Sequence, residues 1–182
     1  MEKLHSDIEH VRILTSLLVQ KGIKEVILSP GSRNAPLLVS IAREKRLKHH
    51  VIVDERSAAF FALGIAQQTD RPVALICTSG TALLNYSPAV AEAFYQGIPL
   101  IVISADRPTE WIDQDDSQTI RQQNALDNFV KGSFQLPTAI TGEEDRWHAN
   151  RLVNEAINLS LNNRKGPVHI NIPLREPLYE FQ

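Results

Sequence analysis

The stretch PVALICTSGTA (72–82) joins an apolar run, a tight turn and the start of a helix. Its first six residues are continuously apolar, and the next four are small or hydroxyl-bearing and include Gly80. A strand that is apolar at every position is typical of a parallel sheet with helices on both faces. The stretch therefore predicts an α/β fold in which each strand leads into a helix.

The same alternation extends in both directions from this stretch. Strands are expected at 25–29, 51–53, 72–77, 99–104, 129–136 and 168–172. Helices are expected from the S-x-x-E capping box at Ser6 to a stop at Gly22, and at 37–45, 57–68, 78–95 and 149–157. Residues 105–128 are expected to form a polar loop with a short helix at 117–124. The pattern predicts a doubly wound, mostly parallel sheet of about six strands with helices on both faces.

Composition narrows the class of protein. The chain has 182 residues, 43% of them hydrophobic, which is enough for the core of one ordinary domain. Its net charge of -2 and the absence of a lysine or arginine run argue against a nucleic-acid partner. The polar N-terminus and the lack of a long apolar stretch predict no signal peptide, no membrane span and a cytoplasmic location.

Arginines follow three of the predicted strands, as Arg33, Arg56 and Arg107. Ligands of doubly wound sheets bind outside the carboxyl ends of the strands, so these side chains are expected to form an anion-binding rim. Arginine binds carboxylates and phosphates through two parallel hydrogen bonds. The alternative is that each arginine contacts solvent or a neighbouring helix end.

Glu55 lies between an apolar strand and the helix SAAFFALGIAQQ (57–68), which has almost no polar face. We expect this helix to be buried on all sides and Glu55 to be desolvated, which raises the pKa of a carboxyl group. Such a group suits proton transfer. The alternative is an acidic residue that stabilises a helix N-terminus.

The turn TSGTA (78–82) places Ser79 and Thr81 at a helix start, where free N–H groups can hold an anion. The alternative is a structural turn with Ser79 or Thr81 as the N-cap residue. It matches neither the phosphate loop G-x-x-x-x-G-K-[ST] nor the G-x-S-x-G nucleophile motif. The single cysteine, Cys77, is expected to be a buried apolar residue, and the histidine spacing predicts no metal site.

Five segments together resemble one family of thiamine-diphosphate enzymes. They are SPGSRNAPL (29–37), DERSAAFFALGIA (54–66), TSGTALLNYSPAVAEA (78–93), ISADRP (103–108) and DSQTIRQ (116–122). The second and third are similar to the wider superfamily. The first, fourth and fifth are similar to the 2-succinyl-5-enolpyruvyl-6-hydroxy-3-cyclohexene-1-carboxylate synthases of the menaquinone pathway.

The resemblance implies a cofactor, two substrates and a set of site residues. The family decarboxylates 2-oxoglutarate on thiamine diphosphate and adds the succinyl-semialdehyde unit to isochorismate. A glutamate aligned with Glu55 hydrogen-bonds N1′ of the aminopyrimidine and promotes loss of the thiazolium C2 proton. Ser32, Arg33, Arg107 and Gln118 match positions that line the substrate pocket, and Ser79 and Thr81 are expected near the cofactor.

The resemblance also implies parts that lie outside this chain. Residues 1–172 are expected to be the pyrimidine-binding domain, and residues 173–182 the start of a linker to further domains. The Gly-Asp-Gly motif that binds the magnesium or manganese ion in the family does not occur in the sequence. Family members are homodimers or larger, with active sites between subunits, so the isolated chain is expected to be inactive.

Two other functions remain open at this point. One is the pyrimidine-binding domain of another thiamine-diphosphate lyase, of the acetolactate synthase type; SPGSR (29–33) and SADRP (104–108) argue against it. The other is a non-catalytic α/β module that binds anions at its arginine rim.

Overall fold

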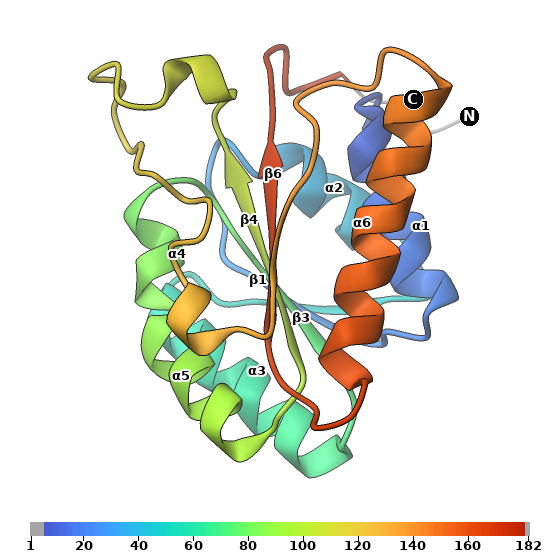
Figure 1. Ribbon diagram of the computed structural model, residues 1–182, viewed down its shortest axis with the longest axis vertical. Helices are drawn as coiled ribbons and strands as arrows, with labels where there is room; N and C mark the ends of the chain where they lie inside the picture. The colour runs from blue at the N-terminus through green and yellow to red at the C-terminus, as the bar shows by residue number, and fades with distance from the viewer. Residues whose placement is uncertain (1–5, 181–182) are drawn as a thin grey trace.

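The computed structural model describes residues 6–180, which form a single sheet of six parallel strands with helices on both faces (Figure 1). The strand order is β2-β1-β3-β4-β6-β5, and all five neighbouring pairs are parallel. The strands are β1 (Glu25–Leu28), β2 (Lys48–Val51), β3 (Val73–Cys77), β4 (Leu100–Asp106), β5 (Ser133–Gln135) and β6 (Val168–Pro173). The predicted doubly wound α/β fold is confirmed.

The helices divide between the two faces of the sheet. One face carries α1 (Glu9–Gln20), α2 (Ala35–Arg43) and α6 (Glu143–Leu161), and the other carries α3 (Glu55–Thr69), α4 (Thr81–Asn85) and α5 (Ser87–Gln96). Because the chain passes from β1 outward to β2 and then back to β3, the sheet has its switch point between β1 and β3. Doubly wound sheets bind ligands at this point.

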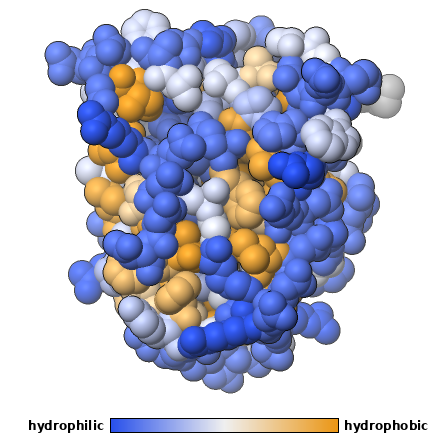
Figure 2. Space-filling view, in the orientation of Figure 1, coloured by the Kyte–Doolittle hydropathy of each residue, from blue (hydrophilic) through white to orange (hydrophobic). Residues whose placement is uncertain are grey.

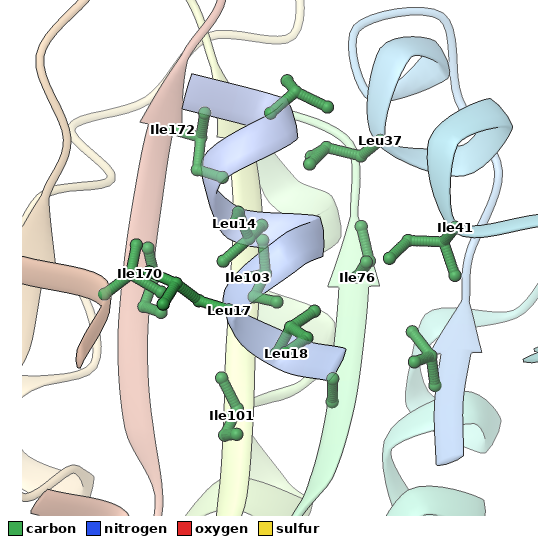
Figure 3. Close-up of a cluster of buried hydrophobic side chains, with 14 of the residues drawn as sticks. Leu14, Leu17, Leu18, Leu37, Ile41, Ile76, Ile101, Ile103, Ile170 and Ile172 are labelled. Carbon is green, nitrogen blue, oxygen red and sulfur yellow. The ribbon is translucent and has the colours of Figure 1, made fainter. Parts of the chain in front are cut away.

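Each face has its own hydrophobic core. On the first face, Leu14, Leu17 and Leu18 of α1 point toward the isoleucines of β4 and β6, and α2 adds Leu37 and Ile41 (Figure 3). On the second face, small residues of α3 and α5 pack against β3 and β4. Every residue of β3 and β4 is buried, as a central parallel strand requires.

Strand β2 lies before its predicted position at 51–53. It spans Lys48–Val51, is mostly exposed and forms one edge of the sheet, so it does not have the continuous apolar pattern of a covered strand. Val51 and Val53 are 59% and 75% exposed. The prediction placed the strand too late because it took the apolar run 51–53 as covered, whereas the two valines of that run are exposed.

The capping box predicted at Ser6 is wrong. Ser6 Oγ accepts a hydrogen bond from Ile8 N at 3.2 Å, and α1 begins at Glu9 without a side-chain cap. Ser6 N instead donates to Ser40 Oγ at 3.1 Å, which ties the segment before α1 to α2. The predicted stop at Gly22 is confirmed: Gly22 has a φ of +76° and directly follows the C-cap residue of α1.

The helix predicted at 78–95 is two helices, α4 and α5, that meet at Tyr86. Pro88 follows in the first turn of α5, where its missing N–H costs nothing. The Tyr86 side chain is fully buried, and its hydroxyl donates to Ser29 Oγ at 3.0 Å. The break thus directs Tyr86 under the turn that follows β1.

The polar segment after β4 is a loop, as predicted, but contains no helix at 117–124. Its short helical turns lie at Thr109–Trp111 and Asp127–Phe129. Gln118 and Asn124 have φ values of +55° and +64°, which a right-handed helix does not allow.

Residues 174–180 fold back over the carboxyl end of the sheet. Leu174 and Leu178 are buried in the core of the first face, and Leu174 N donates to Asp106 O at 2.9 Å. Asp7 N donates to Glu180 O at 3.1 Å, so the two ends of the described chain lie together. The segment predicted as the start of a linker therefore packs on the domain up to Glu180; residues 1–5 and 181–182 lie outside the described part.

Candidate active site

A cavity of about 540 Å³ opens at the carboxyl ends of β1, β3 and β4. We call it the arginine pocket; its lining residues are Ser32, Arg33, Thr78, Ser79, Arg107, Ser117, Gln118 and residues 176–180. The turn after β1, the turn after β3 and the loop after β4 each contribute side chains. The pocket therefore lies at the switch point of the sheet, where the topology predicts a ligand site.

The structure brings together five of the seven predicted site residues. Ser32, Arg33, Ser79, Arg107 and Gln118 line the arginine pocket. Glu55 and Thr81 do not line it: Glu55 is the half-buried first residue of α3, and Thr81 is the exposed first residue of α4. Two sites are therefore distinguished, the arginine pocket and the start of α3.

Arg33 is held by the folded-back tail. Its guanidinium donates to Leu174 O at 3.1 Å and to Glu176 Oε1 at 3.3 Å, and the side chain is 13% exposed. The preceding turn is fixed by Asn34, whose side chain accepts from Gly31 N and donates to Ser29 O. The tail thus orients the guanidinium, and Asn34 fixes the backbone turn that carries it.

Arg107 crosses from β4 to the turn after β3. Its Nη1 donates to Ser79 Oγ at 2.6 Å, and its Nε donates to Asp116. The Asp106 carboxylate accepts from Arg107 N at 2.8 Å. Burial raises the pKa of Asp106, although its hydrogen bond from Asn171 acts in the opposite direction. The Arg107 guanidinium holds the pKa of Asp116 below its ordinary value.

Only two of the three predicted rim arginines meet. Arg56 follows the edge strand β2 and is exposed, outside the residues that line the pocket. The strand order explains this difference, because β1 separates β2 from β3 and β4. The sequence analysis missed Arg175, which lines a second cavity of about 560 Å³ together with Arg33 and Arg107. No signal marked it, because it lies in the segment predicted as a linker.

At the turn after β3, one backbone N–H that could hold an anion is already used. Gly80 N donates to Gln122 Oε1 at 2.6 Å, and Gly80 itself is the N-cap residue of α4, without a side-chain cap. The predicted N-cap role of Ser79 or Thr81 is therefore wrong. Ser79 instead contributes its hydroxyl to Arg107.

The start of α3 separates the roles of two acidic residues. Asp54 is the N-cap residue, and its carboxylate accepts from Ser57 N at 2.8 Å. Within the described residues, the Glu55 side chain makes no hydrogen bond. Burial raises the pKa of Cys77 and of Tyr86, and the charge of Glu55 adds to both increases. Cys77 is fully buried, as predicted.

The prediction that α3 is buried on all sides is wrong. Phe60 and Phe61 are 43% and 44% exposed, and Val51 and Val53 of the preceding segment are also exposed. Because this apolar face is open, Glu55 is half-buried rather than desolvated. Figure 2 shows that hydrophobic residues also reach the surface on the side of α4 and α5, where Leu84 and Tyr95 are exposed.

Within residues 6–180, no group of three or more His, Cys, Asp or Glu side chains is arranged to hold a metal ion. None of the helices described is long and apolar enough to cross a membrane.

Comparison with known proteins identifies the family. Residues 9–126 match the model of the thiamine pyrophosphate enzyme, N-terminal TPP binding domain. The chain belongs to this family. The matched range holds the start of α3 and the turns after β1, β3 and β4, so it includes every predicted site residue.

Curated relatives of the chain carry the name given by the motif resemblance. The 2-succinyl-5-enolpyruvyl-6-hydroxy-3-cyclohexene-1-carboxylate synthase of Porphyromonas gingivalis is 54% identical over 98% of this chain and 31% of its own length. The synthases of the same name from Cytophaga hutchinsonii and Phocaeicola vulgatus are 55% and 50% identical over 91% and 98% of this chain, and over 30% and 32% of their own lengths. The chain thus spans about a third of the curated relatives it matches, and the resemblance is confirmed.

Proposed function

We propose that this chain is the pyrimidine-binding domain of a synthase that decarboxylates 2-oxoglutarate and adds the succinyl-semialdehyde unit to isochorismate. The observation that carries the proposal is the arginine pocket, in which five residues chosen from sequence converge. The names of the curated relatives favour this reaction over an acetolactate-type lyase. They also favour an enzyme domain over a non-catalytic anion-binding module.

Glu55 fits contact with the aminopyrimidine of thiamine diphosphate. Glu55 is half-buried and is not the helix cap, and the same helix carries the exposed apolar side chains of Phe60 and Phe61. A ring with polar edges and apolar faces suits such a surface. In the proposal, Glu55 hydrogen-bonds ring atom N1′ and holds a proton there, and Ser79 and Thr81 lie near the cofactor. When bound, thiamine diphosphate supplies the electron sink for decarboxylation of a 2-oxo acid.

Arg33 and Arg107 fit the carboxylates of the two proposed substrates, which are both dicarboxylates. Each guanidinium already pairs with a carboxylate of this chain, Arg33 with Glu176 and Arg107 with Asp116. A substrate carboxylate has the same chemistry and the same two-oxygen geometry. Ser32 and Gln118, which line the same pocket, are proposed to add neutral hydrogen bonds to the substrates.

The remaining parts of the enzyme are proposed to lie outside this chain. Residues 1–172 are assigned to the pyrimidine-binding domain, and residues 173–182 to the start of a linker whose first part, up to Glu180, packs on that domain. The Mg²⁺ or Mn²⁺ ion and the diphosphate are assigned to a further domain of a second subunit in a cytoplasmic homodimer. The relatives are about three times as long as the chain, and α3 has an open apolar face, which both support this assignment. The chain alone is expected to be inactive.

Arginine variants of the full-length protein that carries this domain test the proposal. Arg33→Ala and Arg107→Ala remove a charge-assisted pair of roughly 1.5–3 kcal/mol, so KM for isochorismate or 2-oxoglutarate should rise about ten- to a hundredfold. Arg46→Ala is the control, because Arg46 pairs with Glu44 on the surface, outside the pocket. Unchanged constants for both substrates in both pocket variants would refute the proposal.

A further inference from the structure

A buried network of polar side chains lies next to the arginine pocket. Its members are Ser104 and Asp106 of β4, Gln122 of the following loop, Gln135 of β5 and Asn171 of β6; we call it the amide network. Gln122 and Asn171 are each 1% exposed. A buried amide group that lacks a hydrogen-bond partner is strongly destabilising, so this network is stable only if its bonds are complete.

Asn171 is the centre of the amide network, and its side chain makes four hydrogen bonds. Its Oδ1 accepts from Ser104 Oγ at 2.7 Å and from Gln122 Nε2 at 2.9 Å. Its Nδ2 donates to Asp106 Oδ2 at 2.8 Å and to Gln135 Oε1 at 2.7 Å. These four bonds use both donors of the amide and both lone pairs of its oxygen.

Gln122 extends the amide network to the turn after β3. Its Oε1 accepts from Gly80 N at 2.6 Å, while its Nε2 donates to Ala105 O at 3.1 Å as well as to Asn171. One side chain of the loop therefore connects β4, β6 and the start of α4. No other side chain of the amide network contacts β4, β6 and the start of α4 together.

Gln122 and Asn171 do not line the arginine pocket, but their bonding partners adjoin residues that do. Asp106, which accepts from Asn171, also accepts from Arg107 N. Gly80, which donates to Gln122, follows Ser79, and Ser79 accepts from Arg107 Nη1. A Cβ atom at Gly80 would lie 2.6 Å from Gln118 O, so the turn and Gln118 are in close contact.

We propose that Gln122 and Asn171 are positioning residues that orient Arg107 and Gln118 for recognition of a substrate carboxylate. The inference rests on the proposed function of the arginine pocket. Arg107 is held through its backbone by Asp106, a member of the amide network, and through its guanidinium by Asp116 and by Ser79. The residue after Ser79, Gly80, donates to Gln122 of the network. A displacement of about 1 Å at a substrate-binding group can cost about a hundredfold in rate.

The geometry of the network is tested in the 182-residue chain by hydrogen exchange of the Gly80 amide. Gln122→Met keeps the length of the side chain and removes both polar atoms. Exchange at Gly80 should become at least about tenfold faster, since its N–H loses its acceptor, while amides of β3 and β4 keep their protection. Gln20→Met is the matched control, because it makes the same change of side chain and removes only an exposed 3.0 Å hydrogen bond to Ser16 on α1, outside the amide network. Unchanged exchange at Gly80 would overturn the inference.

The positioning role is tested by kinetics of the full-length protein. Gln122→Met and Asn171→Leu should raise KM about tenfold or more for the substrate that Arg107→Ala affects. The half-saturation concentration of thiamine diphosphate should stay within about twofold, which general damage to the fold would not allow. In the Arg107→Ala background, Gln122→Met should add less than about a twofold further loss, because coupled residues are not additive.

The outcomes separate this inference from the proposed function. If Arg107→Ala leaves both substrate constants unchanged, the proposed function of the pocket fails. If Arg107→Ala weakens a substrate but the two amide variants do not, or if their effects add fully to that of Arg107→Ala, the positioning role fails and the proposed function stands.

Discussion

Asp54 and Glu55 are neighbouring carboxylates with different surroundings at the start of α3. Asp54 caps the helix through Ser57 N, and hydrogen bonding from Ser57, first from its side chain and then from its N–H, holds the pKa of Asp54 below its ordinary value. Glu55 lies in the first turn of the same helix, and its charge acts on Cys77 and Tyr86 inside the core. Since the cap is already supplied, the helix does not need Glu55 as its N-cap.

Glu55→Gln separates a proton-transfer role from a structural one. In the full-length protein, the variant should fold and bind substrates but exchange the C2 proton of thiamine diphosphate much more slowly, because an amide cannot hold the proton. The loss of a first-turn charge should cost only about 0.3–1 kcal/mol. Proton–deuterium exchange followed by magnetic resonance, together with thermal unfolding, measures both effects.

Asp54→Ala is the control for Glu55→Gln. It removes the cap and should cost about 1 kcal/mol of stability with the C2 exchange rate preserved. Normal exchange in Glu55→Gln, accompanied only by a small loss of stability, would leave Glu55 as a helix-terminus charge.

The residues of the arginine pocket differ in how far the sequence could predict them. Arg33 and Arg107 could be predicted because each lies just after a central parallel strand, so the topology brings them to one edge. Gln122 and Asn171 could not, because their roles depend on contacts 42 and 49 residues apart in the sequence. Arg175 could not, because only the folded-back tail brings it to the second cavity.

The turn between β3 and α4 has no room for a side chain. Gly80 has a φ of +79°, and a Cβ atom there would lie 2.6 Å from Gln118 O. Gly22, after α1, has a similar φ of +76° but open space around it. The two glycines therefore share a backbone requirement and differ in packing.

Gly80→Ala and Gly22→Ala separate these two requirements. Gly22→Ala should lower the free energy of unfolding by about 1–2 kcal/mol, which is the cost of a positive φ for a residue with a Cβ atom. Gly80→Ala should lower it by at least about 3 kcal/mol, because the overlap with a backbone oxygen adds to that cost. Urea unfolding measures both values, and equal losses would contradict the close packing of the turn against Gln118.

Element positions were predictable where a strand is central and less so at the edge. β3 and β4 are buried along their full lengths, so their apolar runs mark them directly. β2 is partly polar because one side of it has no neighbouring strand, and the exposed residues Val51, at its end, and Val53, beyond it, drew the prediction to 51–53. The α4–α5 break was missed because Ala, Leu and Val continue with helical spacing on both sides of Tyr86.

Two buried histidines, His10 and His169, make the stability of the whole domain depend on pH. His10 Nε2 contacts Pro173 O at 3.1 Å, and His169 Nε2 contacts Ser104 Oγ at 2.8 Å. Burial lowers the pKa of each from 6.5 to about 4. Both are therefore neutral in the folded domain at pH 5.5, whereas histidines in the unfolded chain take up protons there.

The domain should lose stability on acidification from pH 7.5 to pH 5.5. A histidine whose pKa is lower in the folded state contributes fully above the unfolded value near 6.5, and that contribution falls as pH drops toward 4. The expected loss is about 1.4 kcal/mol per histidine at pH 5.5. Urea unfolding at the two pH values measures it.

Single variants assign this pH dependence. His10→Gln and His169→Asn should each remove about half of the difference between the two pH values, whatever their effect at pH 7.5. The raised pKa of Asp106 acts in the opposite sense, because it favours protonation of the folded state. The variants therefore test the assignment more directly than the total difference, and unchanged differences would contradict it.

The hydrogen bond from Asp7 N to Glu180 O brings the first and last described segments of the domain together. A domain whose two ends meet on its surface can be inserted as a unit into a longer polypeptide without forcing apart the segments on either side. It can equally be opened at a surface turn and joined across the old ends, so that the order of its elements is rotated while their packing stays the same.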